Sequence, residues 1–368
     1  MSAADSVAAA LAARLDETHA RLCNELLQAR RKDGAWTGRL SSSALATAVS
    51  VFGLASLDPH AHRDLIAAGL DWLCAHANPD GGWGDTPASA SNVSTTLLCW
   101  SALNAASDGG AARYAAGDHA AHWLRNVIGS LEPAAIVRHV AHRYGKDRTF
   151  SAPILAMCAL AGRLGSGRDA WRDVPQLPFE LAVLPHRCFR MLRLHVVSYA
   201  LPALIAVGLM HHRLLPARSF VRRRLRDAAT PRVLTVLQRL QPPNGGFLEA
   251  PPLTAFVLMS LCACRLHDHR VAQHCARFLC ATARHDGSWP IDTNLATWVT
   301  TLAINGLAEA SSHNPLASAE RASLLTLLLE QQHVTRHPFT HTAPGGWAWT
   351  NLPGSVPDAD DTSGVLRA

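Results

Sequence analysis

Residues 80–83 read Asp80-Gly81-Gly82-Trp83, and this short turn decides the fold because the chain repeats it. Apolar segments of helical length lie on both sides of each copy. The other copies are Asp33-Gly34-Ala35-Trp36, Asn244-Gly245-Gly246-Phe247, Asp286-Gly287-Ser288-Trp289 and Gly345-Gly346-Trp347. Neighbouring copies lie about 42 to 58 residues apart, except for one gap of about 164, which suits a two-helix repeat. Stacked helix pairs of this kind close into a solenoid or an α/α barrel.

Each turn is predicted to end one helix and lead to the next. Glycine supplies the left-handed backbone geometry that ends helices such as those predicted over 68–77 and 233–240. The following helices are expected to begin near Asn92, Pro252, Asn294 and Asp358. The aromatic ring of each turn is predicted to pack between helix pairs, with its polar edge bonding outward. Strand signals are sparse and no Gly-rich phosphate loop appears, so the sequence predicts an all-α protein.

Composition indicates a large buried core. The 368 residues are 48% hydrophobic and 17% charged, with a formal net charge of +6. One cluster of arginines fits either a solvated helix face or a surface for anionic lipid or nucleic acid. Its members are Arg218, Arg222, Arg223, Arg224 and Arg226. The net charge is modest for this length, and no nucleic-acid partner is expected.

The start of the chain, residues 1–22, lacks the basic start and apolar core of a secretory signal, so a first helix and a cytoplasmic protein are expected. The most apolar stretch, 194–210, is shorter than the roughly 20 residues that span a bilayer, which favours a buried or interfacial helix. The nine cysteines show no disulfide-framework spacing and are expected to be buried thiols.

Near its end the chain reads Asp358-Ala359-Asp360-Asp361-Thr362, with three carboxylates in a short segment. Clustered carboxylates repel one another's charge, so at least one is expected to stay protonated near neutral pH and to serve as a proton donor. Taken alone, such a cluster is also common at a solvated helix start. Its place after Gly345-Gly346-Trp347 favours the acid.

These features together resemble the squalene-hopene cyclases, which are class II triterpene cyclases with two α/α-barrel domains. The resemblance covers essentially the whole chain and rests on the aromatic turns, on 345–349 and on the Asp-X-Asp-Asp-Thr motif at 358–362. The stretch Trp171-Arg172-Asp173-Val174-Pro175, leading through Pro178-Phe179-Glu180 to Leu184-Pro185, is similar to the family's Trp-then-Pro-Pro-Glu segment. It implies that this chain is the N-terminal portion of such an enzyme.

The resemblance also implies site residues. Asp360 would protonate a terminal alkene, while Asp358 and Asp361 would hold its orientation and acidity. Because the resulting carbocations need stabilisation without a base that quenches them, aromatic faces would line the cavity, each contributing about 0.5–2 kcal/mol. The matching aromatics are Trp171, Trp298 and Trp349, for which core packing is the alternative interpretation.

The implied architecture is a terpene cyclase/prenyltransferase-type toroid with one inserted barrel and an incomplete catalytic barrel. Residues 1–25 form an N-terminal helix of the catalytic barrel, 26–290 the inserted barrel and 291–368 the start of the catalytic barrel. Such cyclases sit on one membrane leaflet, so a monotopic protein on the inner membrane is expected. Because much of the catalytic barrel is missing, activity is expected to require a second chain supplying the C-terminal half.

Some positions depart from the family's pattern. The repeat usually carries glutamine six residues before the aromatic, and only Gln241 keeps it. Arg30, Ala77, Ala283 and His341 stand at the other positions. Val299 replaces an acidic residue after Trp298, which puts the hopene-forming product in doubt. A segment rich in cysteine and histidine, 262–275, matches no zinc-site spacing, so no metal or cofactor is expected.

The leading hypothesis is therefore proton-initiated, metal-free cyclisation of squalene or a related linear polyprene to a polycyclic triterpene. An alternative is a class II diterpene-type cyclase that takes a prenyl diphosphate and shows Mg²⁺ dependence. A non-catalytic α-barrel that binds lipid or a partner is the third interpretation.

Overall fold

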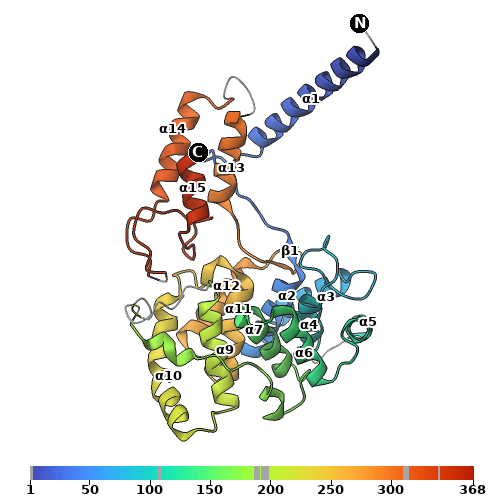
Figure 1. The fold of residues 1–368 in the computed structure, drawn as a ribbon, viewed down its shortest axis with the longest axis vertical. Helices are drawn as coiled ribbons and strands as arrows, with labels where there is room; N and C mark the ends of the chain where they lie inside the picture. The colour runs from blue at the N-terminus through green and yellow to red at the C-terminus, as the bar shows by residue number, and fades with distance from the viewer. Residues whose placement is uncertain (1–2, 106–109, 186–190, 192–198, 310–314, 339) are drawn as a thin grey trace. The chain divides into compact units, whose positions relative to one another are not determined.

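The computed structural model describes residues 3–105, 110–185, 191, 199–309, 315–338 and 340–368. Helices dominate this part of the chain, and the two strands are two residues long each (Figure 1). The predicted all-α fold class is confirmed. The long helices are α1 (Ala3–Gln28), α2 (Ala44–Leu57), α3 (Arg63–Ala75), α4 (Val93–Ala102), α5 (Ala111–Ile128), α6 (Pro133–Tyr144), α7 (Arg148–Leu160), α9 (Leu201–Leu214), α10 (Phe220–Leu240), α11 (Pro251–Ala263), α12 (Arg270–Thr282), α13 (Ala296–Glu309), α14 (Ser318–Glu330) and α15 (Ala359–Arg367). The strands β1 (Ser42–Ser43) and β2 (Trp289–Pro290) pair in antiparallel register.

The chain divides into two compact units. Unit 1 comprises Met1–Arg39 and Asn294–Ala368, and unit 2 comprises Leu40–Thr293. The N-terminal helix α1 is thus grouped with the C-terminal segment, and the long middle segment forms a unit of its own. The predicted boundaries, after residues 25 and 290, lie slightly N-terminal of these divisions.

Unit 2 is a closed ring of inner helices covered by outer helices. Around the ring, α2 packs on α4, α4 on α7, α7 on α9, α9 on α11 and α11 on α2. The outer helices follow the same order: α3 packs on α2, α5 on α4, α6 on α7, α10 on α9 and α12 on α11. This arrangement of paired helices is an α/α barrel, as the repeated turn predicts.

The inner helices are apolar on nearly all sides because they are enclosed on nearly all sides. Ala46 through Leu54 of α2 are all buried, and so are most residues of α11. Small residues let these two helices approach closely: a Cβ added at Gly53 would lie 3.3 Å from the Ala255 carbonyl oxygen. The middle of the apolar stretch predicted over 194–210 belongs to this ring, since α9 is buried from Ile205 to His212. Within the described chain, no helix has both the length and the hydropathy needed to cross a membrane.

The aromatic turns lock neighbouring helices together by a repeated pair of hydrogen bonds. In each turn the aromatic residue's backbone N–H donates to a threonine hydroxyl at 3.0 or 3.1 Å: Trp36 to Thr300, Trp83 to Thr96, Phe247 to Thr254, Trp289 to Thr47 and Trp347 to Thr362. The indole Nε1 groups donate to backbone carbonyls of the preceding helices: Trp36 to Leu26, Trp83 to Leu73, Trp289 to Leu279 and Trp347 to Leu328. The polar edge therefore bonds to the preceding helix and not outward as predicted.

Two of the turns exchange partners, and this exchange explains the division into units. The turn that precedes α2 donates from Trp36 to Thr300 of α13, within unit 1. The turn that precedes α13 donates from Trp289 to Thr47 of α2, within unit 2. Each turn thus pairs with the helix that follows the other turn, so residues 40–293 close on themselves although both of their ends continue into unit 1.

Unit 1 has a smaller core between α1, α13, α14 and α15. Its buried members are Trp36, Ala303, Ile304, Leu307, Leu316, Leu324, Leu328, Trp347 and Val365. The partly buried Val299 packs against this core, close to Gly38, where an added Cβ would lie 2.5 Å from the Val299 Cγ2 atom. The residue that departs from the family's acidic position therefore has a packing role.

Cysteine chemistry agrees with buried thiols. All eight cysteines within the described residues are free. Burial raises the pKa of both Cys262 and Cys264 to about 12, so these thiols stay protonated near neutral pH.

Candidate active site

The three aspartates lie at the start of α15 because Asp358 caps this helix. Asp358 has an extended backbone, with φ −137° and ψ 179°, and its Oδ1 accepts a hydrogen bond from the Asp361 backbone N–H at 2.8 Å. The carboxylates thus occupy the positive end of a helix, where negative charge is favourable. The predicted helix start at Asp358 is confirmed.

Trp347 and Thr362 clamp this helix start to the preceding turn. The Asp358 N–H donates to the Trp347 carbonyl oxygen at 3.1 Å, and the Trp347 N–H donates to Thr362 Oγ1 at 3.0 Å. The Thr362 hydroxyl donates in turn to the Asp358 carbonyl oxygen at 2.5 Å. The threonine of the acid motif is therefore also the threonine of the repeated turn.

Replacing Thr362 by valine is expected to lower the free energy of unfolding by about 1–3 kcal/mol, because the Trp347 N–H would lose its acceptor. Urea denaturation would measure this change. Thr326→Val is the matched control, since its hydroxyl donates to the Ala322 carbonyl from an exposed position on α14. Equal losses in the two variants would contradict a specific clamp.

Asp361 is the buried member of the cluster. Its side chain faces inward with 4% of its surface exposed, and its Oδ1 has no hydrogen-bond partner among the described residues. Burial raises the pKa of Asp361 to about 7, and the negative charge and hydrogen bond of Asp358 and the charge of Asp360 add to this effect. The cluster therefore carries a proton close to neutral pH, as the sequence predicts.

The elevated pKa of Asp361 makes stability depend on pH. Its folded pKa exceeds the ordinary value of 3.8, so between about pH 4 and pH 7 the folded chain binds a proton that the unfolded chain does not. This contribution to stability is present below pH 4 and is lost as the pH rises through 7. Asp361→Asn should then raise the free energy of unfolding by about 1–3 kcal/mol near pH 8 and by far less near pH 4.

Denaturation of the wild type and the Asp361→Asn variant at both pH values measures this difference. The exposed Asp118 on α5 provides the control substitution, Asp118→Asn, which should leave the pH dependence unchanged. A gain of the same size at both pH values would show that the buried carboxyl does not titrate in this window.

Asp360 lies on the opposite side of the helix start and is exposed. Its backbone carbonyl accepts a hydrogen bond from Ser363 Oγ at 2.9 Å. Because a proton donor must touch its substrate, Asp360 is better placed for contact than the buried Asp361. The donor role predicted for Asp360 stays a prediction.

Trp298 and Trp349 belong to the same unit as the acids. The Trp349 carbonyl oxygen accepts hydrogen bonds from the backbone N–H groups of Thr297 and Trp298, at 3.0 and 3.1 Å. This contact holds the loop before α15 against the first turn of α13, and α13 itself packs on α15. Both indoles are half-buried, so part of each ring is available to a ligand.

Trp171 is not brought to this site within either unit. It belongs to unit 2, is 5% exposed and makes an edge-on contact with the His211 ring at 5.8 Å between centroids. Its carbonyl oxygen also accepts a hydrogen bond from His211 Nε2 at 3.1 Å. Its surroundings are those of a core residue, and its predicted place in a substrate cavity has no support in the geometry of unit 2.

A polar groove of about 510 Å³ lies beside this loop and did not emerge from the sequence. Gln331 and His333 line it from the end of α14, while Thr350 and Ser355 line it from the loop before α15. Burial lowers the pKa of His333. No apolar spacing marks these residues, so the sequence pattern gave no signal for them.

Metal-binding side chains do not gather in the structure. Across the described ranges, no three His, Cys, Asp or Glu residues lie together as a metal site requires. The segment 262–275 is divided between the ends of α11 and α12 and an intervening turn.

Comparison with known proteins gives a family relationship for the first third of the chain. The family model described as the squalene-hopene cyclase C-terminal domain matches residues 5–129. Over these residues the chain is a relative of the squalene-hopene cyclases. The matched range contains α1 through α5 and the turns at Trp36 and Trp83, whereas the carboxylate cluster lies outside it. The model describes the family's C-terminal domain, so the predicted identity of this chain as an N-terminal portion stays a prediction.

Other comparisons add little. No curated protein matches. Among solved structures, the apo form of the type II terpene cyclase MstE from Scytonema matches at 14% identity with a TM-score of 0.39, covering 68% of this chain and 97% of that one. A likeness of this degree does not establish a shared activity.

Proposed function

We propose that this relative of the class II terpene cyclases uses the carboxylate cluster at the start of α15 to begin the cyclisation of a linear polyprene by protonation, with squalene as the leading substrate. The observation that supports this proposal is the pairing of a buried Asp361, which holds a proton near neutral pH, with an exposed Asp360 beside it. Ordinary solvated carboxylates lose their protons well below pH 7 and could not protonate an alkene.

In the proposed reaction Asp360 donates its proton to the terminal alkene. The π electrons of that double bond form the new C–H bond, which leaves a tertiary carbocation that the next double bond of the chain attacks. Asp358 fixes the helix start, and Asp361 keeps the cluster partly protonated. The half-exposed faces of Trp298 and Trp349 stabilise the cationic intermediates, each by about 0.5–2 kcal/mol.

The reaction needs a cavity that excludes water, and unit 1 leaves apolar helix faces exposed. Leu11 of α1, Leu302 of α13 and Leu325 of α14 are 55%, 53% and 59% exposed. Leu366 of α15 is 73% exposed. Faces like these are normally covered in an α/α barrel, as they are around unit 2. The proposal therefore includes a further helical segment, supplied by a second chain, that covers the acid and completes the barrel.

The same exposed faces favour a second candidate, a non-catalytic barrel that binds lipid or a protein partner. A third candidate keeps the acid motif but takes a prenyl diphosphate, as class II diterpene-type cyclases do. The three candidates differ in what turnover requires: no cofactor for squalene, Mg²⁺ for a diphosphate, and no turnover at all for a binding barrel. We place the protein in the cytoplasm, on the surface of the inner membrane, where a polyprene would be available.

The test is turnover of squalene, read by mass spectrometry of lipid extracts. The chain is assayed alone and with the protein encoded immediately downstream, and geranylgeranyl diphosphate with Mg²⁺ is assayed in parallel. Cyclised squalene that needs both chains and disappears in Asp360→Asn is the expected result. Product from the diphosphate alone would favour the diterpene-type enzyme, and no product from either substrate would favour the binding barrel.

A further inference from the structure

We infer that the first two turns of α10, in unit 2, are a docking surface for a membrane that contains anionic lipid. This inference concerns a surface of the inserted barrel and does not rest on the catalytic proposal. The surface consists of the apolar residues Phe220, Val221 and Leu225 and of the basic residues Arg218, Arg222, Arg223 and Arg224.

The apolar residues of this surface point away from the core of unit 2. Phe220, Val221 and Leu225 are 69%, 75% and 59% exposed. The buried face of α10 begins only at Arg226 and continues through Ala229, Val233 and Leu237. With 3.6 residues per turn, Val221 and Leu225 lie one above the other on the side opposite this buried face. A helix that turns its large apolar side chains to solvent is expected to have something to bind.

Arginines surround these apolar side chains. Arg218, Arg222, Arg223 and Arg224 are all exposed, and the Arg224 guanidinium lies 5.2 Å from the centre of the Phe220 ring. Asp227 is the nearest acidic side chain on α10, and it is occupied by His212 at 2.9 Å and by Arg223 at 4.0 Å. The start of the helix is therefore strongly positive, and the complementary partner is an anionic surface.

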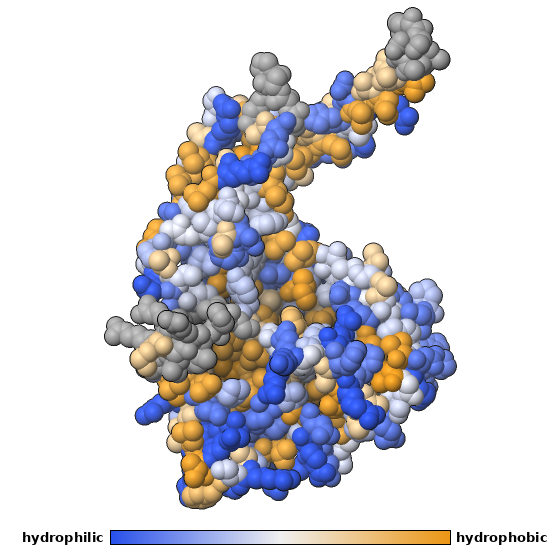
Figure 2. Space-filling view, in the orientation of Figure 1, coloured by the Kyte–Doolittle hydropathy of each residue, from blue (hydrophilic) through white to orange (hydrophobic). Residues whose placement is uncertain are grey.

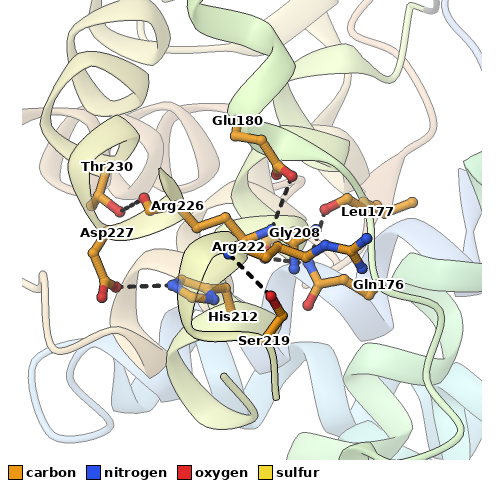
Figure 3. Close-up of polar contacts among 10 residues, drawn as sticks. All are labelled: Gln176, Leu177, Glu180, Gly208, His212, Ser219, Arg222, Arg226, Asp227 and Thr230. Atoms are coloured by element: carbon orange, nitrogen blue, oxygen red, sulfur yellow. Dashed lines mark hydrogen bonds and ion pairs between the residues drawn. The ribbon is translucent and has the colours of Figure 1, made fainter. Parts of the chain in front are cut away.

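The base of this helix is rigid, so the surface is presented in a fixed orientation (Figure 3). The buried Arg226 donates to Glu180 at 3.0 Å, and Ser219 caps the helix by accepting from the Arg222 N–H. His212, which is 1% exposed, ties α9 to α10 through Asp227. Because Arg226 is committed to Glu180, it contributes to anchoring the helix and not to the basic surface.

A membrane fits this surface better than nucleic acid does. Phosphate groups alone would be met by arginines, but they would gain nothing from Val221 and Leu225. A lipid surface provides both the phosphates for the guanidinium groups and an apolar layer for the exposed side chains. Hydrophobic surface is visible over the α10 region in Figure 2.

Co-sedimentation of this chain with vesicles tests the inference. Vesicles of phosphatidylcholine alone are compared with vesicles of equal parts phosphatidylcholine and phosphatidylglycerol, at low and at high salt. Binding that needs phosphatidylglycerol and weakens with salt is expected. Because each arginine near such a surface strengthens binding about fivefold, Arg222→Gln with Arg224→Gln should weaken it roughly 10–30-fold.

The apolar contribution is tested with a second double variant, Val221→Ser with Leu225→Ser, which should weaken binding at least tenfold. The matched control is Arg138→Gln with Arg143→Gln on α6, which removes the same charge from exposed positions and should bind as the wild type does. Unchanged melting curves show that the variants fold. Equal loss in the control, no loss in the serine variant, equal binding to phosphatidylcholine alone, or tighter binding to single-stranded DNA would each overturn the inference.

Discussion

Replacing Asp360 by asparagine should reduce polyprene cyclisation by about 10²–10⁴-fold, the usual contribution of a positioned general acid. The amide has nearly the shape of the carboxylic acid but carries no proton that it can give to an alkene. Product formation per unit time, measured by mass spectrometry with the completing chain present, gives the ratio. Because Asp360 is exposed and its side chain caps nothing, stability should change by less than about 0.5 kcal/mol.

The exposed Asp118 provides the control for this experiment, since Asp118→Asn removes a carboxylate from α5 without touching the cluster. Its cyclisation rate should equal that of the wild type. If Asp361→Asn abolished the reaction while Asp360→Asn left it intact, the buried aspartate would be the donor and the assignment of Asp360 would be wrong.

Replacing Trp289 by alanine should lower the free energy of unfolding by about 3–5 kcal/mol, which is among the largest effects that a single core substitution produces. The Trp289 side chain is completely buried. Its Nε1 donates to the Leu279 carbonyl oxygen at 2.8 Å, and its backbone N–H joins Thr47 at 3.0 Å. Truncation leaves a cavity at the contact that closes unit 2 and also leaves the Leu279 carbonyl oxygen without this donor.

Denaturation monitored by circular dichroism measures the effect of Trp289→Ala. Tyr114→Ala on α5 is the control, because this aromatic side chain is 66% exposed and should contribute less than about 0.5 kcal/mol. A loss below about 1 kcal/mol for Trp289→Ala would show that the aromatic turn does not hold the barrel together.

The sequence predicted the helical fold well because the repeated turn is a local signal. Gly81 and Gly245 have positive φ values of 88° and 89°, as the left-handed geometry of such turns requires. The partner exchange between the turns of Trp36 and Trp289 is not local. Thr300 and Thr47 lie more than two hundred residues from the N–H groups that they accept, so no short pattern could reveal these pairings.

The site was predicted in part for the same reason. The motif located three carboxylates at a helix start, and the structure places them there. Which carboxylate is buried depends on tertiary packing, although one signal was available: Val365 is an apolar residue one turn after Asp361, which puts both on the inner face of α15. The inaccessibility of Trp171 depends on contacts with His211 that the sequence does not specify.

The central claim is that cyclisation begins with a proton from the enzyme, and incorporation of deuterium tests it most directly. In D₂O the carboxyl groups of the cluster exchange their protons, so the hydrogen that is added to the terminal alkene becomes deuterium in a new C–D bond. Mass spectrometry of the cyclised product should then show one additional deuterium, and product made in H₂O should show none. Cyclised product that forms in D₂O without carbon-bound deuterium would contradict proton-initiated chemistry at this site.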